Sequence, residues 1–229
     1  YRPTTETVHE TPIVLFPPWI NKFYILDLKA QNSLIKWVTE QGYTLFVVSW
    51  INPTAKGDYS EVGIEEYIEE GFLTAIEKAK EICAVKQVNA IGYCIAGTTL
   101  SLTLALMKKR GDKSVKSATL FTALTDFSDQ GDFTPCLQND FVDAIVEEIG
   151  EDGILPSYIM ARTFSYLRAN DLVYGPAIRS YMLGETPPAF DLLYWNGDGA
   201  NLPGKMAVQY LRDLCQSNKF ADGGITLFG

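Results

Sequence analysis

A strand-like run that ends in a tight turn of small residues constrains the fold of this chain more than any other feature. The apolar stretch 88–91 ends at Gly92, Cys94 follows shortly after, and a helix-like stretch begins at once. Strand, sharp turn, nucleophile and helix follow in this order in a nucleophile elbow, where small residues let a strained turn pass close to its neighbours. The helix N-terminus beside the sulfur favours a thiolate at Cys94, the attacking form. The run therefore predicts a nucleophilic cysteine at the end of a strand.

The match to the elbow pattern has one departure. The usual form is Gly-x-nucleophile-x-Gly. Here Ala96 stands at the last position, and Gly97 follows it. Because Ala is also small, the pattern still favours catalysis by Cys94 over the plain alternative, a buried cysteine at a strand end.

Strands and helices alternate through the first half of the chain. We expect strands at 12–16, 43–50, 87–91 and 115–121, and helices at 33–41, 63–84 and 96–109. On the helix at 33–41 we expect Leu34, Trp37 and Val38 to form the apolar face. Such alternation implies parallel strands joined by right-handed crossovers. We therefore predict an α/β fold of the hydrolase type, with a parallel sheet and helices on both faces.

The second half of the chain has a different character. Residues 127–220 lose the alternation, carry many aromatic residues, and predict helices near 138–149, 156–169, 171–183 and 203–216. We divide the chain into a core (1–126), a helical cap or lid inserted over the sheet (127–220) and the start of a return to the core (221–229). The alternative for the middle segment is a separate helical domain. A lid is favoured because folds of this kind vary at the carboxyl ends of their strands.

A stiff loop follows the first predicted strand and carries the sequence Pro17-Pro18-Trp19-Ile20-Asn21-Lys22. Active sites in such sheets lie beyond the carboxyl ends of the strands, where this loop and Cys94 meet. In hydrolase-type folds a loop at this position supplies one backbone N–H to the oxyanion hole, and the residue after the nucleophile supplies the other. These donors would be Ile20 or Asn21 and Ile95. The Pro-Pro pair is also a rigid turn, and both interpretations can hold together.

No base for Cys94 is evident in the sequence. His9 is the one histidine, and it precedes the first strand in a charged stretch that indicates a solvated surface residue. Asp126 ends the fourth strand, where some folds of this type place a triad acid. Asp27 and Trp195 lie in otherwise apolar surroundings. A buried Asp is costly unless it is paired, so the residues alone favour a structural role for Asp27.

Composition excludes several classes of function. The net charge is −9, from 28 acidic and 19 basic residues, which argues against nucleic-acid binding. No apolar run approaches the roughly 20 residues of a membrane-spanning helix, and the first residues do not form a signal peptide. The chain lacks an initiator Met, so we expect it to be cut from a longer protein. The four cysteines form no CxxC pair, which predicts no metal site. A large, disulfide-poor core without an export signal indicates a reducing cytoplasm.

Along nearly the whole chain the sequence resembles the polyhydroxyalkanoate synthases, cysteine acyltransferases that polymerise 3-hydroxyacyl-CoA. The segments that carry the resemblance are 17–22, 24–28, 49–50, 67–71, 88–95, 116–119, 124–128, 167–172 and 190–196. In detail the chain is similar to single-subunit members that favour short-chain monomers. The resemblance implies an α/β-hydrolase core under a cap, with Cys94 in the place of a lipase-like serine. It also marks Asp27 and Trp195 as pocket candidates.

The same resemblance implies parts that these 229 residues do not contain. In the family a catalytic Asp and His lie downstream of the region that Gly229 reaches, and an amino-terminal domain precedes it. We therefore predict that the chain is part of a catalytic domain and is inactive alone. No cofactor is expected, because CoA is a leaving group of the substrate. The implied partners are 3-hydroxyacyl-CoA, the growing polyester chain, a second copy of the protein and the granule surface in the cytoplasm.

Two other functions stay open at this point. A cysteine-elbow hydrolase that cleaves esters or lactones would use the same turn. An inactive truncated paralogue that binds granules or a partner synthase would explain the missing base.

Overall fold

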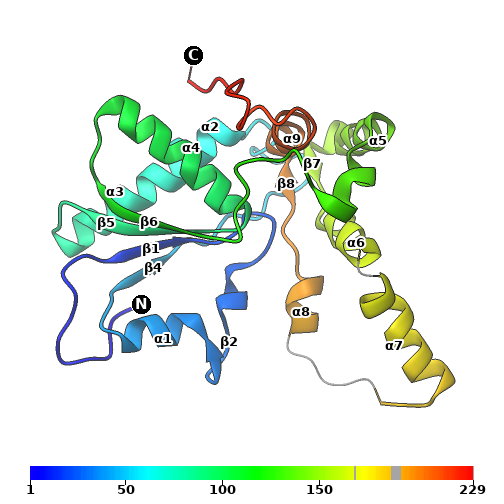
Figure 1. The fold of residues 1–229 in the computed structure, drawn as a ribbon, viewed down its shortest axis with the longest axis horizontal. Helices are drawn as coiled ribbons and strands as arrows, with labels where there is room; N and C mark the ends of the chain where they lie inside the picture. The colour runs from blue at the N-terminus through cyan, green and yellow to red at the C-terminus, as the bar shows by residue number, and fades with distance from the viewer. Residues whose placement is uncertain (168, 187–191, 229) are drawn as a thin grey trace.

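The centre of the molecule is a four-stranded parallel sheet in the order β4-β1-β5-β6 (Figure 1). A computed structural model describes residues 1–167, 169–186 and 192–228. The strands are β1 (Ile13–Phe16), β4 (Leu45–Val47), β5 (Val88–Tyr93) and β6 (Val115–Phe121). β1 pairs in parallel with β4 and β5, and β5 pairs in parallel with β6. The predicted α/β class with a parallel sheet is confirmed.

Helices cover both faces of this sheet, because side chains that alternate along β1 are apolar on both faces and need cover on each. Val14 and Phe16 pack into the apolar cluster beneath α3 and α4, whereas Ile13 and Leu15 pack against α1 on the other face. The helices are α1 (Leu34–Glu40), α3 (Thr74–Cys83) and α4 (Ile95–Arg110). Residues that alternate along a strand point to opposite faces, so a strand buried on both faces is apolar throughout.

The helix predicted at 63–84 is one continuous helix made of three segments. These are α2 (Ile64–Glu66), the π-helical segment η2 (Tyr67–Leu73) and α3. Residues at both junctions keep right-handed helical angles, so the chain direction does not break. A Cβ on Gly71 would lie 2.8 Å from the Trp50 ring, so this glycine lets the indole pack directly on the helix backbone.

One predicted helix face is wrong in detail. We expected Trp37 to lie inside with Leu34 and Val38, but Trp37 is 59% exposed. The Ser33 hydroxyl accepts from the Lys36 backbone N–H and begins α1 at Leu34. In this two-turn helix the buried side chains are Ile35, Val38 and Thr39, spaced three and four residues apart as one helix face requires.

The second half consists of short helices arranged around a small antiparallel pair, β7 (Ile154–Leu155) and β8 (Leu202–Pro203). The four predicted helical stretches of this half are all present. They are α5 (Asn139–Ile149), α6 (Ser157–Leu167), the continuous run η5 (Asn170–Tyr174), α7 (Gly175–Ala177) and η6 (Ile178–Met182), and the continuous run α9 (Gly204–Val208) and η7 (Gln209–Gln216). The short α8 (Leu192–Gly197) completes this half.

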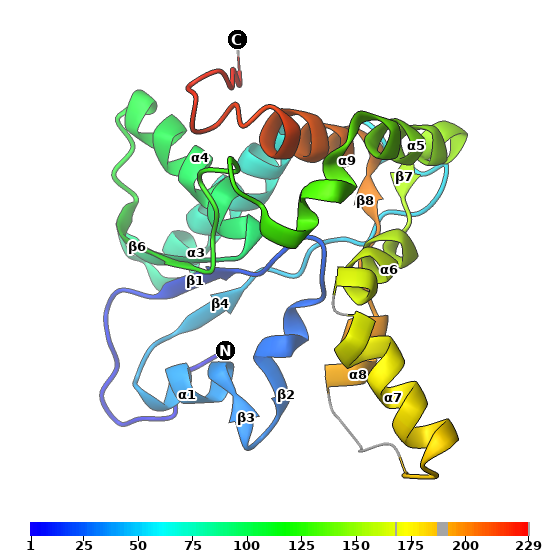
Figure 2. The ribbon, with the colours of Figure 1, turned by 45° about the vertical axis from the view of Figure 1, so that its right-hand side comes forward.

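The described residues of 157–197 form a projection that we call the arm (Figure 2). It extends away from the sheet and carries α6, α7 and α8. Arg168, Phe190 and Asp191, which belong to two segments of the resemblance, lie outside the described residues.

One apolar cluster joins the two halves of the chain. It contains Trp19 and Ile95 from the sheet side and Val142 and Leu211 from the helical side. Whether the second half is a lid or a separate helical domain stays a prediction. The boundaries at 126 and 220 stay predictions.

Candidate functional site

Cys94 occupies a strained turn between β5 and α4. Its backbone angles are φ 56° and ψ −132°, a region that side-chain-bearing residues rarely adopt. Such a conformation costs about 1–3 kcal/mol and persists only where its surroundings hold it. The Cys94 N–H donates to the Phe121 carbonyl at the end of β6 (2.8 Å), and the Gly97 N–H donates to the Cys94 carbonyl (2.8 Å). The turn is therefore tied to the neighbouring strand and to the first turn of α4.

Two glycines make this turn possible. A Cβ on Gly92 would lie 2.6 Å from the Gly97 Cα, and a Cβ on Gly97 would lie 2.5 Å from the Ala123 Cβ. Both approaches are too close for a side chain. Gly97 therefore fills the role of the second glycine in the elbow pattern, and Ala96, which is fully buried, stands where the usual pattern has it.

Burial raises the pKa of the Cys94 thiol, and the hydrogen bond from the Ile95 backbone N–H only partly opposes that rise. The net direction corrects the expectation that the helix N-terminus favours a thiolate. The physical reason is that an anionic sulfur loses more hydration in this half-buried turn than one backbone N–H restores. At neutral pH the sulfur is therefore a thiol.

The loop 17–22 is anchored to the sheet side by two indole groups. Trp50 donates its Nε1–H to the Pro17 carbonyl (2.7 Å). Trp19, within the loop and 1% exposed, donates to the Thr99 hydroxyl on α4 (3.3 Å). This loop is thereby fastened one turn beyond the elbow on the helix that Cys94 begins, which supports the predicted pairing of loop and elbow.

A third indole holds the same loop from the helical side. Trp195, from α8, donates its Nε1–H to the Lys22 carbonyl (2.7 Å), and the Ala200 backbone N–H donates to the Ile20 carbonyl (3.3 Å). The structure therefore places Trp195 beside the loop that contains Ile20 and Asn21. Its indole N–H is used for positioning that loop.

Two of the carboxylates singled out in the sequence do not join the site. Asp27 is exposed on β2 (Asp27–Lys29), where its charge raises the pKa of Tyr1 after the larger effect of burial. The expectation of apolar surroundings for it is wrong, because the two-stranded pair of β2 with β3 (Asn32–Ser33) has a solvent face. Asp126 is also exposed and accepts from the Ser128 N–H and the Asn218 amide, contacts that lower its pKa.

His9 lies at the wrong edge of the sheet to serve Cys94. It precedes β1, so it stands at the amino edge, whereas Cys94 follows the carboxyl end of β5, which runs parallel to β1. The His9 ring stacks on Tyr43 with the centroids 4.0 Å apart. The prediction of an exposed surface histidine is confirmed.

Sequence reasoning missed two residues of η7 that lie beside the elbow. The Tyr210 ring meets Trp19 edge-on with the centroids 5.5 Å apart. Burial, together with the neighbouring Cys215 and Cys94 thiols, raises the pKa of Tyr210 well above its usual range. Cys215 is buried in the shared cluster, where burial raises its pKa to about 12. No local signal marks either residue, because the fold brings η7 to Cys94 from far along the chain.

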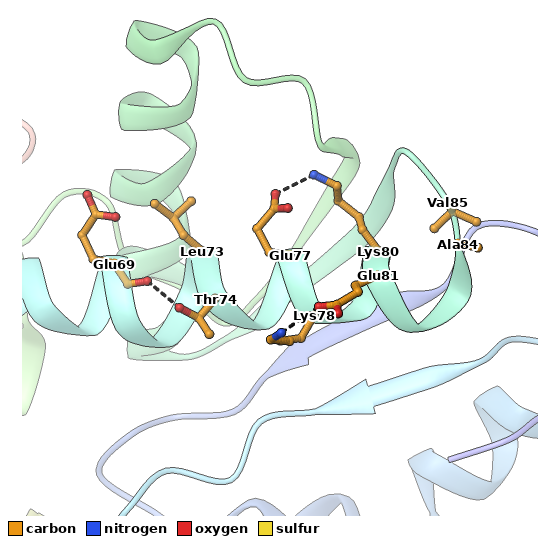
Figure 3. Close-up of a pocket in the computed structure, with 9 residues that line it drawn as sticks. All are labelled: Glu69, Leu73, Thr74, Glu77, Lys78, Lys80, Glu81, Ala84 and Val85. Carbon is orange, nitrogen blue, oxygen red and sulfur yellow. Dashed lines mark hydrogen bonds and ion pairs between the residues drawn. The ribbon is translucent and has the colours of Figure 1, made fainter.

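A broad hollow of about 720 Å³ runs along η2 and α3 (Figure 3), and Cys94 does not line it. Four of its charged side chains pair with one another, and Glu69 pairs with Arg110 outside the hollow. Lys78 Nζ lies 2.7 Å from Glu81 Oε2, and Lys80 Nζ lies 2.5 Å from Glu77 Oε1. These are the pairs of a solvated helix face, and we assign no chemistry to this hollow.

A second, more apolar hollow of about 330 Å³ lies beside the carboxyl end of β4. Its aromatic walls come from Trp50, Tyr59 and Tyr67. Tyr67 also contacts Trp19 with the ring centroids 6.0 Å apart, so this hollow borders the anchored loop. Cys94 does not line it.

Curated proteins match this chain along nearly its whole length. The poly(3-hydroxyalkanoate) polymerase of Methylorubrum extorquens is 42% identical over 227 residues, which cover 99% of this chain and 37% of that protein. The PhaC subunit of the polymerase from Cupriavidus necator is 40% identical over 235 residues, covering 100% of this chain and 40% of that protein. The corresponding subunit from Rhizobium meliloti is 39% identical, covering 100% and 37%. The chain spans well under half the length of these relatives.

Residues 1–38 match a family model described as the N-terminus of poly-beta-hydroxybutyrate polymerase (PhaC). The chain therefore contains a piece of the sequence that this model describes. Among solved structures, one from a study of carboxylesterases of Nitrososphaera gargenis superposes with a TM-score of 0.48 at 14% identity, covering 96% of this chain and 71% of that one.

Proposed function

Because the chain is a homologue of the poly(3-hydroxyalkanoate) polymerases, we propose that it forms part of the catalytic domain of such an enzyme. The reaction is the polymerisation of (R)-3-hydroxyacyl-CoA into polyhydroxyalkanoate with release of CoA, through an acyl group carried on Cys94. Short-chain monomers such as 3-hydroxybutyryl-CoA are the proposed substrates.

The strained turn at Cys94 is the observation that carries this proposal. It presents one sulfur at the carboxyl edge of the sheet, beside the anchored loop. The Cys94 sulfur attacks the carbonyl carbon of the CoA thioester after its proton passes to a base. The tetrahedral intermediate then expels the CoA thiolate, which takes up a proton. One thioester replaces another, so the acyl group reaches Cys94 with little change in bond energy.

The oxyanion of that intermediate needs backbone donors. We assign this role to the N–H of Ile95, which already lies against the Cys94 sulfur, and to the Ile20–Asn21 part of the anchored loop. In the next step the 3-hydroxyl of one acyl unit attacks the thioester carbonyl of another. An ester bond forms, and the hydroxyl proton passes to the base. The thioester bond of the attacked carbonyl breaks, and its sulfur leaves as a thiolate that takes up the proton.

We propose that the base lies in the part of the polymerase outside these 229 residues. The raised pKa of Cys94 makes a base necessary, and His9 stands at the opposite edge of the sheet. The relatives are more than twice as long as the matched region, which leaves room for the His and Asp that the family resemblance implies.

The helical half supports this chemistry as a cap. We propose that residues 127–220 exclude water from the acyl-cysteine and guide the emerging polyester, with apolar side chains of the shared cluster next to Ile95. A second copy of the protein and the granule surface are the proposed partners, and the cytoplasm is the proposed location. Within the described ranges, no helix is both long and apolar enough to cross a bilayer.

Incubation of the full-length protein with 3-hydroxybutyryl-CoA tests the proposal. A polymerase releases CoA and forms insoluble polymer, with a labelled acyl group transiently attached to Cys94. A cysteine-elbow hydrolase releases CoA and free 3-hydroxybutyrate, which would contradict the proposal. A full-length protein that releases no CoA would be an inactive paralogue.

A further inference from the structure

The loop that carries the proposed oxyanion donors is held from the cap side by a set of contacts that we call the loop clamp. The clamp consists of Trp195, Asp198 and Ala200. Trp195 and Ala200 hold the Lys22 and Ile20 carbonyls, as described above. The Asp198 carboxylate adds two contacts, since it accepts from the Tyr24 hydroxyl (2.8 Å) and lies 3.7 Å from Lys22 Nζ.

The clamp determines where one backbone donor points. A trans peptide unit is planar, so its C=O and its N–H point in opposite directions. No cis peptide occurs among the described residues. Because the Ala200 N–H holds the Ile20 carbonyl, the Asn21 N–H of the same peptide unit must point away from the cap segment. Seating of the cap therefore sets the direction of the Asn21 donor.

We propose that Asp198 is a positioning residue for the acylation step, acting through Tyr24 and Lys22 to keep the Asn21 N–H aimed for the oxyanion. This inference rests on the proposed function and deepens it. Asp198 is the member of the clamp whose side chain contacts two residues that follow the Asn21 peptide, Lys22 and Tyr24. The elbow and the cap are then coupled, because the oxyanion hole is complete only when the cap segment is seated.

The Tyr24 contact stays intact over the working pH range. Burial, and then the hydrogen bond to the Asp198 carboxylate, raise the pKa of Tyr24 to about 12. The hydroxyl therefore remains a protonated donor at neutral and mildly alkaline pH. The Lys22 and Asp198 side chains are 33% and 37% exposed, so their ion pair is screened by solvent and the Tyr24 bond is the stronger tie.

Two reactions of the same sulfur test the inference in the full-length protein. Acylation of Cys94 by 3-hydroxybutyryl-CoA builds an oxyanion, whereas alkylation by iodoacetamide is a displacement at carbon that builds none. We expect Asp198→Ala to slow acylation about tenfold or more, since a 1 Å displacement of a positioned group can cost on the order of a hundredfold. Tyr24→Phe, which keeps the ring, should slow acylation several-fold. Neither variant should change the alkylation rate by more than about twofold, because only oxyanion stabilisation is disturbed.

Asp143→Ala is the matched control. It removes an exposed ion pair, with Arg212, that does not touch the loop, and it should leave both rates unchanged. The inference fails if Asp198→Ala and Tyr24→Phe acylate at the wild-type rate, or if acylation and alkylation fall together. Should Asp198→Ala not fold, Tyr24→Phe decides alone. If the wild-type protein forms no acyl-Cys94, the proposed function and this inference both fail. If the wild-type protein is acylated and both variants are acylated at the same rate, only this inference fails.

Discussion

The elbow region and the arm are both rich in aromatic residues, and they use them in opposite ways. Near Cys94, Trp19 is 1% exposed, and Trp19 and Trp50 each donate an indole hydrogen bond that fixes the loop 17–22. On the arm, Tyr181 is 90% exposed and Tyr194 is 78% exposed. The residue class is the same, but these two tyrosines face solvent. Trp195 is the exception on the arm, because its indole N–H holds the Lys22 carbonyl of the loop.

This contrast shows which region of the fold is held in a fixed geometry. The turn at Cys94 is strained, so it must be held from several sides, and the glycine contacts and indole bonds do so before any substrate arrives. The arm contains no backbone strain of this kind among its described residues, and the rings of Tyr166, Tyr181 and Tyr194 face solvent. Changes near the elbow should therefore have large effects, and changes on the arm surface should have small effects on folding and acylation.

The largest expected effect follows removal of the sulfur. Cys94→Ala should lower polymerisation by the full-length protein about a thousandfold or more, because the acyl carrier is lost. Its melting temperature should stay close to that of the wild type, since the backbone bonds of the turn do not involve the side chain. Activity above background in this variant, measured as CoA release, would refute the assignment of Cys94.

The second largest effect is expected when a side chain is added where the turn packs closely, at Gly97. In Gly97→Ala the new Cβ meets the Ala123 Cβ at 2.5 Å, and overpacking of this kind typically costs about 1–3 kcal/mol of unfolding free energy. Gly197→Ala, on α8 of the arm, meets no atom within 4 Å and should change stability by less than about 1 kcal/mol. Denaturant unfolding of both variants compares the two regions directly. Equal effects would show that the elbow is no more tightly packed than the arm.

A smaller effect is expected in the pH dependence of the same thiol. Burial raises the pKa of Cys94, so its thiolate forms only at higher pH than that of a free thiol. In the isolated 229 residues, which we expect to lack the base, alkylation by iodoacetamide should rise with pH later than that of free cysteine. For this comparison, circular dichroism must first show that the isolated 229 residues are folded. A profile shifted to lower pH would mean that the helix N-terminus outweighs burial after all.

The smallest effect is expected on the arm. Tyr181→Ser exchanges a ring that is 90% exposed and should shift the unfolding free energy by no more than about 0.5 kcal/mol. Acylation of Cys94 should also be unchanged. A clear loss of acylation would show that the arm takes part in the reaction, and the contrast between the two regions would no longer hold.

Local sequence patterns predicted those parts of the fold that depend on residues close together in the sequence. β6 was predicted at its observed bounds, and the elbow at Cys94 has the strained geometry that its small residues suggested. The predicted strand at 43–50 is shorter in the structure, which pairs only residues 45–47 with β1. Strand ends depend on the partner strand, and the sequence of one segment does not contain that information.

Contacts between distant segments were not predictable in the same way. Tyr210 and Asp198 reach the elbow and its loop from the helical half, and nothing in their own neighbourhoods marks them. Asp27 was expected in apolar surroundings because its neighbours in sequence are apolar, but the β2–β3 pair places it in solvent.

The amino-acid sequence by itself determined the alternating α/β order, the position of the elbow turn at Cys94 and the family to which the chain is related, because these depend on periodicity and on short runs of residues. The tertiary structure decided that Gly97 fills the second glycine position, that burial raises the pKa of the thiol, and that residues of the helical half hold the loop beside it. The physical reason is that desolvation and hydrogen-bond direction depend on which distant groups the fold brings together.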